Sequence, residues 1–352
     1  MKSIRLLIVD DSAFMRQLLR DVLGQFPEIK VVDTANNGEQ ALAKILALRP
    51  DVVTMDVEMP VMDGLTALGR IMKECPLPVV MVSSLTQQGA DTAVRALEMG
   101  AVDCVGKPTG GILSINPKVF GLEIAQKIIG ASQATTKTLA MRPPSTIRPA
   151  VSRLTLRRPR LRGVIIGTST GGPRALQTVL PALPANFPVP ILIVQHMPPG
   201  FTASLAKRLN EMSAITVREA QEGDRVEPGL ALVAPGDFHM LLRRDGTVTL
   251  SKDRPLWGVR PAVDMTLMSA VPVWGKDTLA VILTGMGHDG SRGVADLKRV
   301  GGRCIAEAES TCTIYGMPRT IIEAGNADKV APIHQVAQEI VEAVDSWDLA
   351  AH

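Results

Sequence analysis

The stretch RGVIIGTSTGGPRAL, residues 162–176, sets the fold class of the half of the chain that contains it. The apolar run 164–166 leads into a cluster of glycines and hydroxyls at 167–172, and helix-forming residues follow. This order is typical of a tight turn between a buried strand and the N-terminus of a helix. Such a turn either binds a phosphate through its backbone N–H groups or presents one hydroxyl as a nucleophile.

Further apolar runs around this stretch indicate an α/β domain over residues 161–350. Helical periodicity occurs around Leu205 and Val294 and from His334 to Val344. The segment HMLLRRDGTVTLS (239–251) predicts a β-hairpin that turns at Asp245-Gly246. We therefore expect a doubly wound α/β domain with a β-hairpin. The predicted buried strands are GVIIG (163–167), VPILIVQH (189–196), LALVAP (230–235) and DTLAVILTG (277–285).

Residues 1–125 alternate strand-like and helix-like segments in the same way. Nearly continuous Val, Ile and Leu runs are typical of parallel strands that are covered on both faces. The sequence predicts a five-stranded, parallel, doubly wound domain of the flavodoxin-like type. Its strand-like runs are IRLLIVD (4–10), VVDTA (31–35), DVVTMD (51–56), PVVMVSS (78–84) and AVDCVGKP (101–108).

Residues 126–160, between these two domains, are predicted to form a flexible linker. The segment is rich in Ser, Thr, Pro and Arg and has no sustained hydrophobic period. Its arginines indicate either a solvated tether or a contact with an acidic partner.

Composition excludes several classes of protein. No apolar run is long enough to span a bilayer, and the N-terminus lacks a signal-peptide pattern. Four cysteines without metal-ligand spacing indicate reduced thiols and a cytoplasmic protein. A net charge of +3 and an aromatic content of 3% argue against nucleic acid as a partner.

Three carboxylates lie where predicted strands end in the N-terminal domain. Asp10 and Asp11 follow the first strand and Asp56 ends the third, so all three share one edge of the sheet. Oxygen ligands in a small site suit Mg²⁺. Ser83 and Lys107 end the fourth and fifth strands, which completes a phosphoryl site with Asp56 as the nucleophile. For Asp11 alone, helix capping is the alternative.

Residues 1 to about 125 resemble a response-regulator receiver domain, because VDDS (9–12), MDVEMPVMDG (55–64), VSS (82–84) and GKP (106–108) match that family's motifs in order. The resemblance implies that Asp56 accepts a phosphoryl group from a histidine kinase. It also implies that Asp10, Asp11, Asp56 and the carbonyl of Glu58 hold Mg²⁺. Cys104 stands near the place where the family often has an aromatic switch residue. A hydroxyl movement at Ser83 would then be the remaining switch.

The loop at 167–172 lacks the lysine of a Walker loop and the glycines of a dinucleotide fingerprint. It matches G-x-S-x-G instead, with Ser169 at its centre. His196 closes the apolar strand before MPPG and is the candidate base; Asp289, in LTGMGHDG, is the acid that would orient it. The alternatives are a core imidazole for His196 and a helix cap for Asp289. Backbone N–H groups near Met286 and Gly287 are candidate oxyanion donors.

The other four histidines are weaker candidates. His239 is either structural or part of the pocket lining, and His288 is expected to be exposed in a turn next to the candidate acid. His334 carries no signal, and neither does the C-terminal His352.

The segments GTSTGGP (167–173), VQHMP (194–198), LVAPGDFHM (232–240) and LTGMGHDG (283–290) resemble the catalytic domain of the chemotaxis receptor methylesterase (CheB) family. The resemblance implies Ser169 as nucleophile, His196 as base, Asp289 as orienting acid and Met286 as oxyanion donor. It implies hydrolysis of glutamyl methyl esters on chemoreceptors, with deamidation of receptor glutamines as a second activity. No cofactor is needed for this chemistry.

The same resemblance implies that the unphosphorylated receiver restricts access to the catalytic cleft and that phosphorylation relieves the block. The protein would act in the cytoplasm at receptor arrays, without inserting into the membrane. Two rival functions predict different features. A DNA-binding response regulator needs a compact helical reader and a basic face, whereas this C-terminal half is rich in strands. The second rival function is that of a binding module whose serine is inert.

Overall fold

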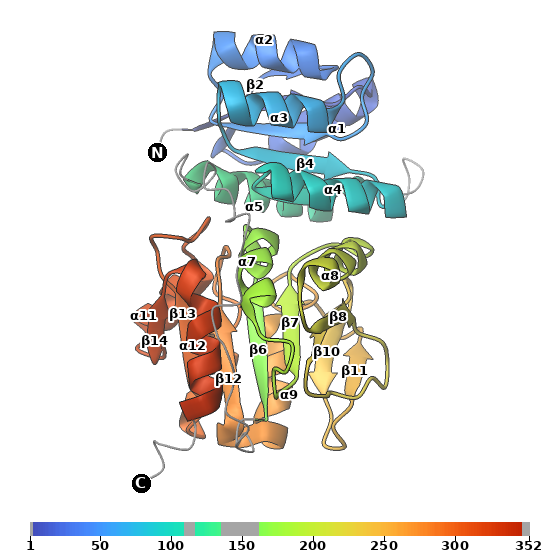
Figure 1. The fold of residues 1–352 in the computed structure, drawn as a ribbon. Helices are drawn as coiled ribbons and strands as arrows, with labels where there is room; N and C mark the ends of the chain where they lie inside the picture. The colour runs from blue at the N-terminus through green and yellow to red at the C-terminus, as the bar shows by residue number, and fades with distance from the viewer. Residues whose placement is uncertain (1–2, 109–116, 135–161, 347–352) are drawn as a thin grey trace. The chain divides into compact units, whose positions relative to one another are not determined.

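The computed structural model describes residues 3–108, 117–134 and 162–346. The chain divides into two compact units, Met1–Arg142 and Pro143–His352 (Figure 1). Each unit contains a parallel sheet with helices on both of its faces, as the sequence predicts. None of the helices within the described ranges combines the length and the apolar character needed to cross a bilayer.

The first unit contains five parallel strands in the order β2-β1-β3-β4-β5. Helices α1 and α5 pack together on one face, and α2, α3 and α4 form a row on the other. Strands β3 and β4 are buried along their whole length, which explains their unbroken apolar sequences. The strands are β1 (Ile4–Val9), β2 (Ile29–Ala35), β3 (Val52–Asp56), β4 (Val79–Ser83) and β5 (Asp103–Gly106).

Four helices of this unit begin with a side-chain cap close to the carboxyl end of a strand. Ser12, Asn37, Asp63 and Thr86 each accept a hydrogen bond from the backbone N–H three residues later. These caps fix where each loop at the functional edge of the sheet ends. The helices are α1 (Ala13–Leu23), α2 (Gly38–Leu48), α3 (Gly64–Glu74), α4 (Gln87–Met99) and α5 (Pro117–Gln133).

Helix α5 extends beyond residue 125, where the sequence analysis begins the linker. Ile124, Ile128 and Ala131 are buried in the core of this unit, so residues 126–133 continue the helix that covers the sheet. The polar residues that follow made this last apolar turn hard to separate from the linker. The rest of the predicted linker, 135–161, lies outside the described residues.

The second unit contains seven parallel strands in the order β14-β13-β12-β6-β7-β9-β8. The central strands β12, β6 and β7 are completely buried. An antiparallel hairpin, β10 with β11, is separate from this sheet, which confirms the predicted fold class. The strands are β6 (Gly163–Thr168), β7 (Ile191–Gln195), β8 (Thr216–Glu219), β9 (Leu230–Val233), β10 (His239–Leu242), β11 (Val248–Ser251), β12 (Thr278–Ile282), β13 (Arg303–Glu307) and β14 (Lys329–Ala331).

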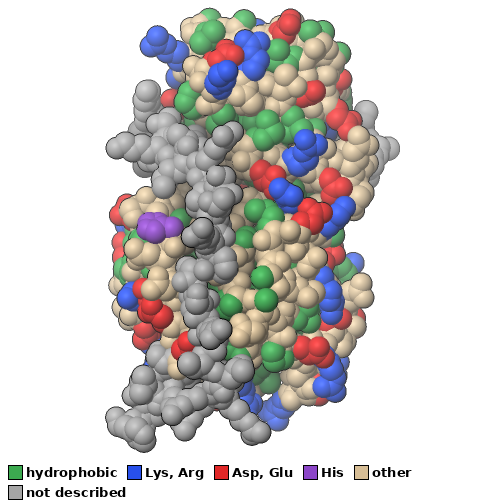
Figure 2. All heavy atoms as spheres, in the orientation of Figure 1, with side chains coloured by type: hydrophobic (Ala, Val, Ile, Leu, Met, Phe, Trp, Pro, Cys, Tyr) green, Lys and Arg blue, Asp and Glu red, His purple; other side chains and the backbone are tan. Residues whose placement is uncertain are grey.

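Two layers of helices cover this sheet. Contacts link α7 with α8 and α12 in one layer, and α10 with α9 and α11 in the other. On the face shown in Figure 2, acidic and basic side chains are interspersed, as the small net charge suggests. The helices are α7 (Gly172–Val179), η1 (Leu180–Ala182), α8 (Phe201–Met212), α9 (Val263–Trp274), η2 (Gly275–Asp277), α10 (Ser291–Arg299), α11 (Met317–Glu323) and α12 (Ile333–Ser346).

Candidate functional site

The strand register brings the candidate serine and histidine to neighbouring positions. Thr168 is the last residue of β6, and it pairs with Gln195, the last residue of β7. Ser169 and His196 are the next residues on each strand, and the His196 N–H donates to the carbonyl of Thr168 at 3.2 Å. Both side chains are buried at the carboxyl edge of the sheet. The sequence prediction that these two residues share one crevice is consistent with this placement.

The candidate histidine and acid form a direct buried pair. His196 Nε2 lies 2.8 Å from Asp289 Oδ2. The Asp289 carboxylate also accepts the backbone N–H groups of Val263 at 2.6 Å, Asp264 at 3.0 Å and Gly290 at 2.9 Å. Two of these donors belong to the first turn of α9, whose N-terminus stabilises a negative charge. Asp289 is thus held in place by four donors.

This environment determines the ionisation of Asp289. Burial alone raises its pKa, but the hydrogen bond from His196 and the backbone N–H groups outweigh burial and lower the pKa below its ordinary value. A carboxylate at this point requires His196 to donate through Nε2–H. The other ring nitrogen, Nδ1, is then the one left to accept a proton.

The Ser169 turn is fixed by its backbone. The Ser169 N–H donates to the carbonyl of Thr284 at 3.0 Å, and Gly171 has a φ of +82°, which favours glycine. Within the described ranges the Ser169 hydroxyl makes no hydrogen bond, so it is not yet bonded to His196. Catalytic hydrogen bonds are often long before substrate binds, so this orientation is compatible with a nucleophile.

The loop after β12 carries the candidate oxyanion donors to the same turn. A Cβ placed on Gly285 would lie 2.8 Å from Ser169 Cβ, so this close approach requires glycine. Met286 and Gly287 follow directly, and among the described residues their backbone N–H groups have no hydrogen-bond acceptor. Two free donors next to the serine are what an oxyanion hole needs.

Gln195 is a positioning residue that the sequence analysis missed. Its side chain is buried, and its Nε2 donates to the carbonyls of Ser169 at 3.0 Å and His196 at 3.2 Å. One amide therefore connects the backbones of the candidate nucleophile and base. The signal was a polar residue at the end of the otherwise apolar strand VPILIVQH.

Glu307 is a second residue that sequence reasoning missed. It ends β13 and is buried, with its carboxyl group bonded to the Thr284 N–H at 2.8 Å and the Thr311 hydroxyl at 2.9 Å. The carbonyl of Thr284 in turn accepts the N–H of Ser169. Burial raises the pKa of Glu307 to about 7. This carboxyl group therefore supports the loop that carries the candidate oxyanion donors.

We expect Glu307→Gln to remove part of the pH dependence of stability. Between about pH 4.5 and 7 the unfolded glutamate is ionised while the folded one keeps its proton, so the free energy of unfolding falls as pH rises. A glutamine can accept from Thr284 and donate to Thr311 at every pH. From pH 5 to pH 8, the free energy of unfolding of the variant should therefore rise relative to that of the wild type, by up to a few kcal/mol. Thermal unfolding of both proteins at pH 5 and pH 8 measures this. A difference in stability between the variant and the wild type that is the same at both pH values would contradict the prediction.

The remaining histidines have other surroundings. His239 is buried, accepts the Ala262 N–H at Nδ1 (3.2 Å) and places Nε2 3.3 Å from the Arg254 carbonyl; burial lowers its pKa. His239 therefore has a structural role: it contacts the backbone of the segment before α9 at two points. His288 and His334 are exposed, and His352 lies outside the described residues.

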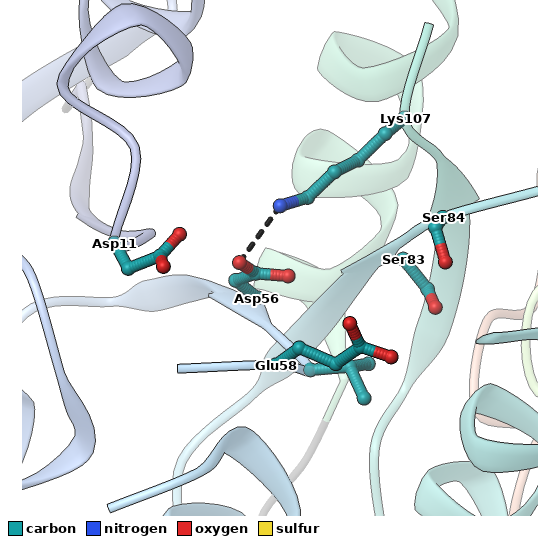
Figure 3. Close-up of a pocket in the computed structure, with 7 residues that line it drawn as sticks. Asp11, Asp56, Glu58, Ser83, Ser84 and Lys107 are labelled. Atoms are coloured by element: carbon teal, nitrogen blue, oxygen red, sulfur yellow. Dashed lines mark ion pairs between the residues drawn. The ribbon is translucent and has the colours of Figure 1, made fainter. Parts of the chain in front are cut away.

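The residues of the predicted phosphoryl site meet at the carboxyl edge of the first sheet. Lys107 Nζ lies 2.7 Å from Asp56 Oδ2 and 3.0 Å from Asp10 Oδ2. Figure 3 shows Lys107 reaching toward Asp56. The residues that line the adjacent cavity of about 230 Å³ are Asp11, Asp56, Val57, Glu58, Ser83, Ser84 and Lys107.

Three carboxylates in this site fit a divalent cation. Asp10, Asp11 and Asp56 each offer an oxygen, and these oxygens lie within 4.8 Å of one another. The buried Oδ2 atoms of Asp10 and Asp56 contact Lys107 but make no well-formed hydrogen bond within the described chain. Burial raises the pKa of Asp56 to about 6, with Lys107 opposing this and Asp10 adding to it. A Mg²⁺ ion would supply the missing positive charge and ligand contacts.

Two further predicted residues of this site are placed as follows. Ser83 is buried, and its hydroxyl donates to the carbonyl of Gly89 at 3.0 Å, toward α4. The Glu58 side chain is exposed at the rim of the cavity. Cys104 is completely buried in β5, and burial raises the pKa of its thiol.

Comparisons with known proteins cover both units. Residues 164–340 match the family described as CheB methylesterase, and residues 6–112 match the response regulator receiver domain family. A protein-glutamate methylesterase/protein-glutamine glutaminase of Symbiobacterium thermophilum is 50% identical over 355 residues, covering 97% of this chain and 98% of that protein. Its counterpart in Thermotoga maritima is 48% identical over 346 residues, covering 97% and 98%.

One solved structure resembles the second unit in particular. The crystal structure of the Thermotoga maritima CheB methylesterase catalytic domain shares 50% sequence identity and a TM-score of 0.51. The match covers 52% of this chain and 98% of the chain in that crystal structure.

Proposed function

This chain belongs to the CheB family of protein-glutamate methylesterases/protein-glutamine glutaminases with an N-terminal receiver domain, and from that membership we propose how its own residues perform the reaction. Ser169 is the nucleophile, His196 the general base and Asp289 the group that orients the base. The single observation that carries this proposal is the buried His196–Asp289 pair. The other ring nitrogen of His196, Nδ1, lies at the end of β7, next to the end of β6 that Ser169 follows.

Ester hydrolysis would proceed through an acyl-enzyme. Ser169 Oγ attacks the carbonyl carbon of the glutamyl ester while His196 takes the hydroxyl proton at Nδ1. The bond to the methoxy oxygen breaks, and methanol leaves with that proton. A water molecule then gives a proton to His196 and attacks the acyl carbon. The bond from the acyl carbon to Ser169 Oγ breaks, and Ser169 recovers its proton from His196. The new carboxylic acid loses its proton to solvent and is released as the glutamate carboxylate.

The negative charge on the tetrahedral intermediate needs donors that are already in position. The N–H groups of Met286 and Gly287 are proposed for this role, because they have no acceptor among the described residues and follow the glycine that packs on Ser169. One such donor typically contributes about 3 kcal/mol to the transition state. Glutamine deamidation would use the same groups, with ammonia leaving in place of methanol.

Methanol release tests the whole proposal. The full chain is incubated with a receptor fragment that carries glutamyl methyl esters, and methanol and new glutamate are measured. We expect both products in equal amounts. A chain that binds the fragment without releasing methanol would support the alternative of a binding module with an inert serine.

The receiver is proposed to accept a phosphoryl group on Asp56 from a histidine kinase. The Asp56 oxygen attacks the phosphorus, the bond from phosphorus to the histidine nitrogen of the kinase breaks, and Lys107 neutralises charge on the transferred oxygens. Asp10 and Asp11, with Asp56 and the Glu58 carbonyl, would hold Mg²⁺, which when bound supplies further neutralisation of that charge. We place the protein in the cytoplasm at receptor arrays, where this kinase and substrate would meet.

Chelation should separate the two chemistries. With acetyl phosphate as phosphodonor and Mg²⁺ present, we expect the rate of methanol release by the full chain to increase at least several-fold. EDTA should abolish this stimulation and leave the basal rate unchanged, because the proposed esterase residues use no metal. Loss of the basal rate in EDTA would contradict the metal-free mechanism, and stimulation that survives EDTA would contradict the magnesium site.

A further inference from the structure

Three side chains from different segments meet beside Asp289, and we call them the Trp257 cluster: Trp257, His288 and Arg292. The Trp257 and His288 rings meet edge to face with their centroids 4.2 Å apart. The Arg292 guanidinium carbon lies 4.2 Å from the centroid of the indole ring. All three side chains are exposed, with 36% of Trp257 accessible. The cluster therefore presents an aromatic and cationic surface to ligands.

The indole is held in place by a strained turn. Leu256 and Val259 exchange backbone hydrogen bonds of 3.2 and 3.0 Å, and Trp257 between them has a φ of +57°. The left-handed region disfavours a bulky side chain, so other contacts must hold the residue there. Trp257 Nε1–H donates to the buried Asp264 carboxylate at 2.8 Å. This exposed tryptophan is thus a fixed surface.

The same anchor connects the cluster to the candidate catalytic acid. The backbone N–H of Asp264 donates to Asp289 at 3.0 Å, while its side chain bonds the indole. His288 immediately precedes Asp289 in the chain. Trp257 is therefore linked to Asp289 through two hydrogen bonds of Asp264, and His288 is linked to it by one peptide bond.

Within the described ranges, the polar groups of the cluster are available to a ligand. Across the described part of the chain, the Arg292 side chain makes neither a hydrogen bond nor an ion pair, and the His288 ring makes no hydrogen bond. Both oxygens of Asp264, the nearby acid, are occupied by the Gly293 N–H and the indole. A guanidinium placed over an aromatic ring still offers its N–H groups for two-point binding of a carboxylate.

We propose that the Trp257 cluster binds a carboxylate side chain that flanks the scissile glutamyl ester, and thereby selects acidic receptor segments as substrates. This proposal rests on the proposed function. Every turnover leaves a glutamate carboxylate, so a segment with several ester sites gains acidic groups near the esters that remain. Arg292 is then a specificity-determining residue, because charge-assisted hydrogen bonds to a carboxylate are stronger than neutral ones.

Two peptides and four proteins test this proposal. Each peptide carries one glutamyl methyl ester; glutamates flank the ester in the first, and alanines replace them in the second. Wild-type full chain should show a kcat/KM about tenfold higher for the acidic peptide, a size typical of one charge-assisted contact. Arg292→Gln should abolish this preference by raising KM for the acidic peptide only. Arg244→Gln, which removes an exposed arginine of the β10–β11 loop, is the matched control and should keep the preference.

The outcomes distinguish this inference from the proposed function. If wild type hydrolyses both peptides equally well, or if Arg292→Gln slows both equally, the cluster does not select carboxylates and the inference is wrong. If wild type releases methanol from neither peptide, the proposed function is wrong, and so is this inference, because it rests on that function. Arg292→Lys keeps the charge without the planar group and should give an intermediate preference.

Discussion

Replacing Ser169 by alanine is expected to reduce kcat for methyl-ester hydrolysis by about 10⁵-fold, because the attacking oxygen is removed and no other group in the site replaces it. The oxyanion donors and the substrate contacts remain, so a small residual rate above that in water should persist. Initial rates of methanol release from a methylated receptor fragment measure the effect. KM should change little, since the lost interaction forms only along the reaction path.

The fold should tolerate this change, which makes the experiment interpretable. Within the described ranges the Ser169 hydroxyl forms no hydrogen bond, and the turn is held by backbone bonds that alanine keeps. Thermal unfolding of the variant should therefore match that of the wild type within a degree or two. Thr178→Ala, which removes a hydroxyl on α7 bonded to the Arg174 carbonyl, is a matched control that should retain full activity. A rate within tenfold of wild type for Ser169→Ala would exclude the serine as nucleophile.

The sequence predicts that the serine and histidine share one edge of the sheet, because each directly follows a buried strand. In a parallel sheet, residues that end neighbouring strands share one edge. Asp289 is different, since it lies seven residues after β12 and depends on the path of a glycine-rich loop. Its chemistry and its pairing with His196 could be predicted from the motifs, but its three backbone hydrogen-bond donors could not.

Two of these backbone donors, Val263 and Asp264, were missed because α9 has no helical periodicity in its sequence. Val263–Trp274 is apolar on most sides and contains Pro272, so it resembles neither an amphipathic helix nor a strand. Packing decides its conformation, and the first turn of α9 then faces Asp289. Gln195 and Glu307 illustrate the same limit, since a polar residue at the end of an apolar run shows its role only when its partners are in place.

Strand β14 was also missed, for a different reason. It has three residues, Lys329–Ala331, and two of them are exposed, so neither its length nor its pattern differs from that of a loop. It pairs with β13 at the edge of the sheet, where register comes from the neighbouring strand. Short edge strands of this kind depend on tertiary contacts rather than on local sequence.

Asp289→Asn should reduce kcat by about 10⁴-fold and also destabilise the second unit. Each carboxylate oxygen accepts two N–H groups: Oδ2 accepts from His196 and Val263, and Oδ1 accepts from Asp264 and Gly290. An amide has only one acceptor oxygen, so its NH₂ must face two donors. If the NH₂ faces His196, it favours the tautomer that carries its proton on Nδ1, and this nitrogen can no longer accept the serine proton.

The opposite orientation of the amide leaves the Asp264 and Gly290 N–H groups buried without an acceptor. Each orphaned donor costs about 1–3 kcal/mol, so either orientation should lower the unfolding temperature by several degrees. Asp264→Asn is the matched control: its carboxylate accepts two donors, from Gly293 and Trp257, one on each oxygen, and neither is His196. The amide leaves one of these donors without an acceptor, so we expect it to lose some stability, less than Asp289→Asn, and to keep kcat within tenfold of wild type. If both variants lose kcat equally, Asp289 acts only through the fold; if only Asp289→Asn does, it orients the base.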